Sequence, residues 1–166
     1  MDRKISTPPP SSPRYDALLR LLRTANAIWD VSRVFFEQWG LSPSQFNVLN
    51  LLQSHAEGLS QTELGRQLLT HRSNVTGLVD RLEKRGLVRR KSVSGDRRAY
   101  RVVPTKSGVN LLKKILPHYH QEAEDVWDGV SDEGISELLD ALQHVTRNAA
   151  RVIPARSQGT NRKRRL

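Results

Sequence analysis

The sequence of 166 residues contains no cysteine, a single methionine and few aromatic residues, at 5% of the chain. Without cysteine the protein has no disulfide scaffold, no thiolate ligand for zinc or an iron–sulfur cluster, and no thiol nucleophile or redox sensor. No apolar run approaches the ~20 residues that a membrane-spanning helix needs. The first 13 residues also lack the apolar core of a secretory signal. We therefore expect a soluble, cytoplasmic protein.

Positive charge is what the sequence has in excess, and that charge is segregated along the chain. The formal net charge is +10 at pH 7. Residues 60–106 hold twelve basic and four acidic residues, and residues 151–166 hold six basic residues and no acidic ones. Residues 107–150, by contrast, hold eight acidic and three basic residues. A segregated positive surface favours a polyanionic partner, meaning nucleic acid or an anionic membrane surface.

Apolar residues recur at helical spacing over most of the chain, so we expect a mainly α-helical protein. Serine or threonine precedes several of these apolar stripes and glycine follows them, which is typical of helix termini. Pro117 lies inside one predicted helix and predicts a kink there. The expected helices cover residues 14–39, a short stretch after Ser42, another after the capping box at Ser60, and residues 71–85, 107–129 and 131–151.

The hydrophobic period changes after Gly86, where a helix is expected to end. Residues 87–92 and 99–103 are β-prone, and residues 93–98 join them, with Ser94, Gly95 and Asp96 as the turn. Helix, helix, turn, helix and β-hairpin in this order over residues 42–106 predict a winged helix-turn-helix. The expected fold class is therefore mainly α with a small β-hairpin wing, extended by helices on either side.

The predicted helix 71–85 has the residue types that read DNA bases. A helix in the major groove reads base edges with short polar or forked side chains near its N-terminal end. Asn74 suits adenine, Arg72 suits guanine, and Gly77 admits a close approach of the backbone. The base-reading candidates are Arg72, Ser73, Asn74, Thr76 and Gly77.

The predicted hairpin supplies a second DNA contact at its tip. Arg97 or Arg98 is expected to enter a minor groove, whose negative potential attracts guanidinium groups. Asp96 is expected to orient one of these arginines or to pair with Arg81. Further residues are expected on phosphates, where they set affinity more than sequence choice: Ser60, Gln61, Lys84, Arg85, Arg89, Arg90 and Lys91.

These segments resemble the MarR (multiple antibiotic resistance regulator) family over residues 14–152. The matching motifs are LSPSQFNVL (41–49), LSQTELGRQL (59–68), SNVTGLVDRLEKRGLVRR (73–90), GDRRAYRV (95–102) and PTKSG (104–108). The resemblance implies a winged-helix homodimer on pseudo-palindromic duplex DNA. It implies that the same positions of helix 71–85 read bases and that Arg81 also lies near DNA. It further implies that Arg97 or Arg98 is the DNA-contacting arginine of the wing and that Asp96 is the acidic residue that braces it. Members that sense peroxides through a reactive cysteine are excluded.

The resemblance also implies how the chain is divided and regulated. Many members of the family are repressors that release DNA when a small, often aromatic or phenolic, ligand binds, and we expect the same of this protein. The expected parts are a disordered segment 1–13, a first dimerisation helix 14–41, a DNA-binding domain 42–106, C-terminal dimerisation helices 107–152 and a disordered basic tail 153–166.

Three aromatic residues, Trp29, Phe36 and Tyr119, are candidates to line such a ligand pocket. Because each belongs to an apolar helical stripe, packing in a core or a dimer interface is the more common role of such residues. His118 and His120 are two residues apart on a helix and point to different faces, so we expect no metal site. No cofactor is expected either.

The expected function is a homodimeric, sequence-specific transcriptional regulator, and we find no enzyme motif. The acidic residues at 125–133 fit a helix start better than acid–base chemistry. The C-terminal NRKRRL has no adjoining basic amphipathic helix that would favour lipid binding. The alternative function is a sequence-tolerant, architectural DNA-binding protein, which the two basic termini favour.

Overall fold

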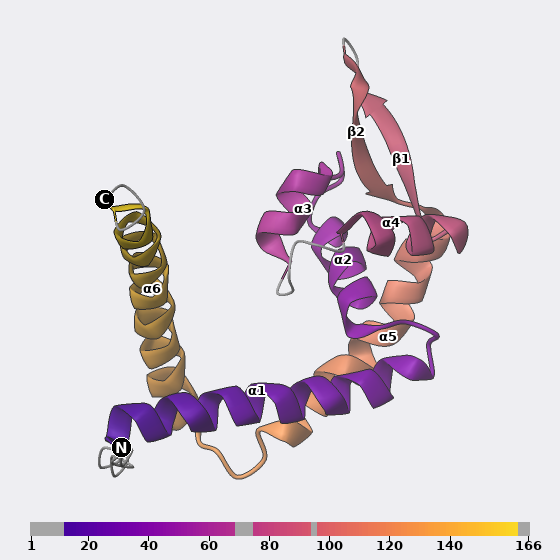
Figure 1. Ribbon diagram of the computed structural model, residues 1–166. Helices are drawn as coiled ribbons and strands as arrows, with labels where there is room; N and C mark the ends of the chain where they lie inside the picture. Colours follow the sequence, from indigo (N-terminus) through magenta and orange to yellow (C-terminus); the bar gives the residue numbers. More distant parts are fainter. Residues whose placement is uncertain (1–11, 69–74, 94–95, 163–166) are drawn as a thin grey trace, which may run out of the picture. The chain divides into compact units, whose positions relative to one another are not determined.

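The computed structural model describes the backbone of residues 12–68, 75–93 and 96–162, and their side chains other than those of 96–99 and 152–162. The chain divides into two compact units, one that ends at His118 and one that begins at Tyr119. Figure 1 shows the elements of the described residues. Their bounds are α1 Pro13–Glu37, α2 Pro43–Gln53, α3 Gln61–Gln67, α4 Val75–Lys84, β1 Val88–Val93, β2 Asp96–Pro104, α5 Lys106–Val126 and α6 Asp132–Arg162.

The first helix begins slightly earlier in the chain than the sequence suggested. Ser12 is the N-cap of α1, because its hydroxyl accepts a hydrogen bond from the Tyr15 N–H at 3.2 Å. Pro13 occupies the first helical position, where a missing N–H costs nothing. We expected residues 1–13 to be disordered, but Ser12 and Pro13 form the start of α1. Residues 1–11 lie outside the described residues.

Two capping boxes fix where α2 and α3 begin, as the sequence predicted. The Ser42 hydroxyl accepts from the Gln45 N–H at 3.2 Å, and the Gln45 side chain accepts from the Ser42 N–H at 2.8 Å. Ser60 and Glu63 make the same reciprocal pair at 3.2 and 2.7 Å. Each box satisfies two backbone donors that the first turn of a helix leaves without a partner.

A left-handed glycine ends α4. Gly86 has a φ of +68°, and the following Leu87 N–H donates to the Leu82 carbonyl at 2.9 Å. This is the hydrogen-bond pattern of a Schellman motif at a helix C-terminus, and it confirms that the helix ends before Gly86, as predicted. At the other end, residues 71–74 of the predicted helix lie outside the described residues.

The hairpin β1–β2 is antiparallel, and its second strand is longer than the sequence indicated. The register runs from Val88 opposite Pro104 to Ser92 opposite Tyr100, and then shifts so that Val93 faces Asp96. Residues 96–98, which we placed in the connection between the strands, therefore belong to β2. Pairing of Asp96 with Val93 extends the ladder, and the extra residues of β2 are accommodated by the irregularity in register.

The core of the first unit joins α1, α2, α4 and the hairpin. The rings of Phe36 and Phe46 stack at 4.3 Å between centroids. An isolated bridge between Leu59 and Val102, with both backbone hydrogen bonds formed, attaches the hairpin to the segment that precedes α3. The side chains with almost no exposure are Phe36, Phe46, Val48, Leu49, Leu52, Leu64, Val79, Leu82, Val88, Val102 and Ile115.

The helix α5 is held closely against the start of the hairpin. The Thr105 hydroxyl accepts from the Gly108 N–H at 3.1 Å and donates to the Gly86 carbonyl at 2.6 Å. Gly108 lies so close to Leu87 that a Cβ at this position would be 2.1 Å from the Leu87 carbonyl oxygen. A side chain is therefore excluded at Gly108 without movement of the backbone.

The second unit contains the long helix α6, which corrects our expectation for the C-terminus. We expected the last helix to end at residue 151 and a disordered tail to occupy 153–166. The backbone of α6 instead continues to Arg162, beyond Pro154. A proline removes one backbone donor, and a helix that is already several turns long propagates more readily than it nucleates. Residues 163–166 lie outside the described residues.

The observed architecture is mainly helical with a two-stranded antiparallel hairpin, and it confirms the predicted winged helix-turn-helix class.

Candidate nucleic-acid interface

The helix α4 buries one face and exposes the other. Val75, Leu78, Val79 and Leu82 are buried. Three of the DNA-contacting residues predicted on this helix are described: Thr76 and Arg81 are exposed, and Gly77 is half-buried. The others, Arg72, Ser73 and Asn74, lie outside the described residues.

A hydrogen bond joins α3 to α4 next to this exposed face. The Thr76 hydroxyl donates to the Gln61 side-chain oxygen at 3.3 Å. Gln61, which we expected on a phosphate, thus uses its amide oxygen to hold the two helices together. Ser60, also expected on a phosphate, caps α3, because its hydroxyl accepts from the Glu63 backbone N–H.

The capping contact also shifts the ionisation of Glu63. The backbone N–H and the hydroxyl of Ser60 stabilise the carboxylate, with smaller contributions from Arg101 and Arg66, so the pKa of Glu63 lies below its ordinary value. Glu63 therefore stays negatively charged at neutral pH and keeps the start of α3 fixed. That negative charge complements the positive end of the α3 dipole.

Several cations that we expected on phosphates are exposed in the structure. Lys84 at the end of α4 and Arg89 on β1 are both exposed. Lys91 is exposed and lies 3.6 Å from the Glu57 carboxylate, a pair too solvated to hold it firmly. The backbone of Asp96, Arg97 and Arg98 belongs to β2, and their side chains lie outside the described residues.

Two arginines that we expected on phosphates are instead engaged within the protein. Arg85 donates to the backbone carbonyls of Gly40 and Trp39, so it ties the end of α4 to the α1–α2 junction. Arg90 forms ion pairs with Asp80 and Glu83. In this geometry Arg85 and Arg90 donate to carbonyls and carboxylates of the protein, which argues against the phosphate contacts that the sequence predicted for them.

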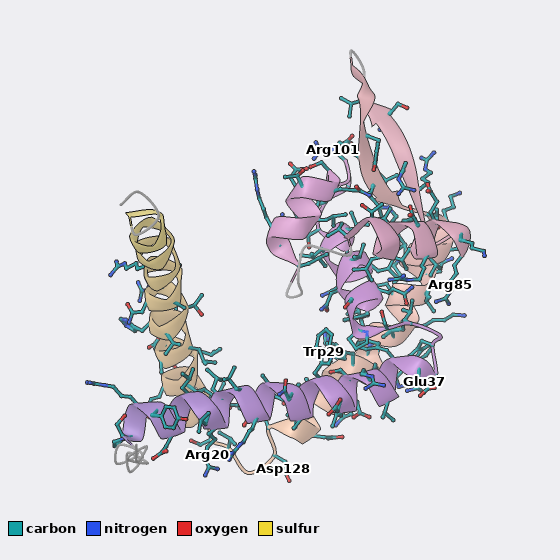
Figure 2. The ribbon with its side chains drawn as sticks, viewed as in Figure 1. Arg20, Trp29, Glu37, Arg85, Arg101 and Asp128 are labelled. Atoms are coloured by element: carbon teal, nitrogen blue, oxygen red, sulfur yellow. The ribbon has the colours of Figure 1, made fainter. Side chains whose placement is uncertain are left out.

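Sequence reasoning gave no role to Arg101, which the structure places at a junction. Its guanidinium donates to the Gly58 carbonyl at 2.8 and 3.0 Å and to the Glu57 carbonyl at 3.1 Å, and it lies 3.4 Å from the Glu63 carboxylate. Figure 2 shows Arg101 between the hairpin and α3. Arg101 therefore joins β2 to the loop and helix that precede α4. Nothing in the local sequence distinguishes it from the neighbouring basic residues.

The three aromatic candidates for a ligand pocket have different surroundings. Phe36 is 1% exposed and stacks on Phe46, whereas Trp29 is 36% exposed on α1. Tyr119 is half-buried and belongs to the second unit.

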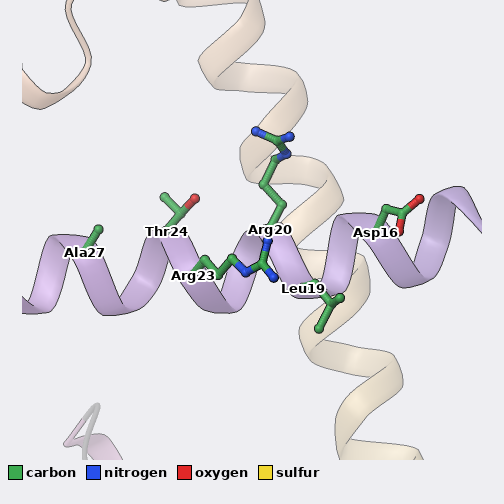
Figure 3. Close-up of a pocket in the computed structure, with 6 residues that line it drawn as sticks. All are labelled: Asp16, Leu19, Arg20, Arg23, Thr24 and Ala27. Carbon is green, nitrogen blue, oxygen red and sulfur yellow. The ribbon is translucent and has the colours of Figure 1, made fainter. Parts of the chain in front are cut away.

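Three cavities in the first unit are lined by other residues. The first, of about 490 Å³, is a groove along one face of α1 (Figure 3). The second, of about 480 Å³, lies where α1 meets α2. The third, of about 270 Å³, lies between α2 and α5 and is lined by residues such as Leu52, Val109 and Lys113. Trp29, Phe36 and Tyr119 line none of these three cavities, so the aromatic pocket stays a prediction.

The described part of the chain contains neither a candidate metal site nor a candidate membrane-spanning helix. No group of three or more His, Cys, Asp or Glu side chains there is arranged to hold a metal ion. The ring of His118, one of the candidate histidines, lies 5.8 Å from the Trp39 ring. No described helix is long and apolar enough to cross a membrane.

The arrangement of α3, α4 and the hairpin defines a DNA-binding winged helix-turn-helix protein. The sequence model of the MarR family matches residues 39–99. The chain is 30% identical over 129 residues to the HTH-type transcriptional regulator MhqR of Bacillus subtilis strain 168, covering 78% of this chain and 88% of that protein. The chain belongs to the MarR family of transcriptional regulators, which confirms the predicted family and the prediction of a regulator that is not an enzyme.

Two other similar proteins bear on the mode of regulation. The transcriptional repressor MprA of Escherichia coli strain K12 is 30% identical over 109 residues, which cover 65% of this chain and 60% of that protein. The crystal structure of CouR from Rhodococcus jostii RHA1, bound to p-coumaroyl-CoA, is 26% identical with a TM-score of 0.71, covering 81% of this chain and 94% of that one.

Proposed function

We propose that this regulator is a homodimer that binds a pseudo-palindromic operator, with α4 in the major groove and the hairpin at the flanking minor groove. The observation that carries the proposal is the exposed face of α4. Thr76 and Arg81 are solvent-accessible on it, and the β1–β2 wing follows directly within the same unit. Polar and forked side chains on a helix beside a basic wing are suited to reading base edges and holding phosphates.

Exposed apolar residues in both units support the dimer. On α1, Leu18, Leu22 and Val34 are 49, 53 and 73% exposed, and on α6, Leu139 is 61% exposed. Surface residues of this size and number on long helices are typical of a face that another chain covers. A second copy is the partner we propose, because two winged-helix lobes related by a two-fold axis match a palindromic site.

Repression with release by a small ligand is the finer part of the proposal. The similar protein MprA is named a repressor, and CouR was crystallised with p-coumaroyl-CoA, whose acyl group is phenolic. A dimer that reads two half-sites one helical turn apart loses affinity when a ligand favours a different spacing of its lobes. We propose an aromatic or phenolic effector on these grounds, and Trp29, Phe36 and Tyr119 stay the candidates that the sequence gives for its contacts.

The test of the DNA-binding proposal is the selection of binding sites from a randomised duplex pool, with the full-length protein at physiological salt. Recovery of one inverted-repeat motif is the expected result. Retention of DNA without any enriched motif would overturn sequence-specific binding and favour the architectural alternative, which the basic termini support.

The roles of individual residues are tested on the selected operator. Arg72→Ala and Asn74→Ala are expected to weaken operator binding while leaving binding to random duplex nearly unchanged, with the removal of each base contact costing about 1–3 kcal/mol. Equal weakening on both DNAs would contradict base reading. Replacing Arg97 and Arg98 together by alanine is expected to weaken binding and to reduce its salt dependence. An unchanged salt dependence would contradict wing contact.

A further inference from the structure

One arginine of the wing, Arg90, is bonded to α4 through three donors. On β1, the backbone N–H of Arg90 donates to Glu83 Oε1 at 2.9 Å, and one guanidinium nitrogen donates to Glu83 Oε2. The other terminal nitrogen donates to Asp80. The Arg90 side chain is 25% exposed, so it is the least solvated partner of this cluster. Because the planar guanidinium of Arg90 bridges two carboxylates, it fixes both the distance and the relative orientation of β1 and α4.

The two carboxylates lie on α4 where negative charge opposes DNA binding. Asp80 and Glu83 follow Thr76 at i+4 and i+7, so these three residues share one face of the helix. Thr76 is one of the proposed base-reading residues. Without a counter-ion, two carboxylates on that face would repel the phosphates that flank the groove.

The same guanidinium also contacts the second strand of the wing. It lies over the Tyr100 ring at 5.2 Å from the ring centroid, a cation–π distance. Its hydrogen bond to Asp80, with smaller contributions from Tyr100 and Glu83, holds the pKa of Arg90 above its ordinary value. Arg90 therefore links α4 to both strands of the hairpin and stays charged throughout.

We propose that Arg90 is a positioning residue for DNA recognition, which neutralises Asp80 and Glu83 on α4 and sets the angle between α4 and the wing without touching DNA. The inference rests on the proposed function, because it assumes that α4 and the wing bind one duplex together. It predicts that Arg90 and its neighbour Arg89 have different roles, although the two are adjacent arginines of one strand. Arg89 is exposed and lies on the opposite side of the strand from this cluster, so it serves as the matched control.

The experiment measures operator and random-duplex affinity by fluorescence anisotropy over a series of salt concentrations for wild type, Arg89→Gln and Arg90→Gln. Arg89→Gln is expected to reduce the slope of log K against log salt by about 0.9 for each phosphate that is no longer neutralised. Arg90→Gln is expected to weaken operator binding on the order of tenfold with the wild-type slope, because Arg90 pairs with carboxylates of the protein and neutralises no phosphate. It is also expected to narrow the ratio of operator to random affinity, because the wing loses its fixed angle.

A rescue experiment separates charge neutralisation from a general loss of fold. Adding Asp80→Asn and Glu83→Gln to Arg90→Gln removes the uncompensated carboxylates and is expected to recover the part of the affinity that is lost to charge repulsion. Arg90→Lys keeps the charge but cannot bridge both carboxylates, so an intermediate effect is expected. Thermal unfolding of each variant shows that it is folded at the assay temperature, and Arg90→Lys tests the inference even if Arg90→Gln does not fold.

Three results would overturn the inference. The first is a slope of log K against log salt that falls in Arg90→Gln as much as in Arg89→Gln. The second is wild-type operator affinity in both Arg90→Gln and Arg90→Lys. The third is a triple variant that binds the operator as weakly as Arg90→Gln does. Failure of the proposed function is a separate result, since it is a wild-type protein that selects no inverted repeat. The effect of Arg90 would then still be measurable on any duplex that the wild type binds.

Discussion

Truncation of Phe36 tests whether this residue belongs to the core or to a ligand pocket. Phe36 is 1% exposed, and its ring stacks on Phe46 at 4.3 Å. Burial of a phenylalanine removes roughly 150 Å² from water, which at about 25 cal/mol per Å² corresponds to roughly 3–4 kcal/mol. The stacked pair adds about 1 kcal/mol. We therefore expect Phe36→Ala to lower the free energy of unfolding by about 4–5 kcal/mol, at the upper end of the range of about 3–5 kcal/mol for such changes.

The assay is urea unfolding followed by circular dichroism at one fixed protein concentration, because the apparent stability of the proposed dimer would depend on concentration. Phe36→Leu is the matched control, since it keeps most of the apolar volume and should cost less than about 1.5 kcal/mol. A decrease below about 1 kcal/mol for Phe36→Ala, with an unchanged denaturant slope, would refute the core assignment. Phe36 would then be available as a pocket residue, as the sequence suggested.

The remaining predictions concern a close approach of two backbones, a charge and the dimer. Gly108→Ala is expected to destabilise the protein by about 1–3 kcal/mol or more in urea unfolding, because its Cβ would be 2.1 Å from the Leu87 carbonyl oxygen; wild-type stability would contradict this close approach. Because folding lowers the pKa of Glu63, its charge stabilises the fold above the ordinary pKa of 4.5 and loses this effect as the pH falls through the folded value. The stability difference between wild type and Glu63→Gln should therefore be largest near neutral pH and shrink below pH 4.5, and a difference that grows in acid would be inconsistent with it. Leu139→Asp should shift the protein toward monomer in sedimentation velocity, and an unaltered dimer would remove α6 from the proposed interface.

The helix termini of the first unit could be predicted because their signals are local. A capping box needs two residues three positions apart, and both Ser42 with Gln45 and Ser60 with Glu63 satisfy that spacing. A left-handed C-terminus needs one glycine at the right place, which Gly86 supplies. Such interactions depend on chain neighbours, so the sequence contains all the information that decides them.

Other features depend on the fold and could not be predicted in this way. The bridge from Leu59 to Val102 pairs one residue with another far along the chain, and a single residue has no hydrophobic period to reveal it. The continuation of α6 past Pro154 depends on the helix that precedes it rather than on the tail's own composition. The start of β2 at Asp96 depends on its partner Val93, since strand limits are set by pairing.

The assignment of basic residues shows most clearly where charge counting fails. Side chains alternate along a strand, and Val88 is buried, so Arg90 shares its inward side while Arg89 and Lys91 lie exposed on the other. An arginine directed inward requires acceptors, and two acidic residues one turn apart on α4 supply them. Arg85 and Arg101 are likewise bonded to backbone carbonyls. Because these three arginines have internal partners, the number of phosphates that each lobe neutralises should be smaller than its count of basic residues. The salt dependence of DNA binding should therefore follow the number of exposed cations, and not the net charge of the segment.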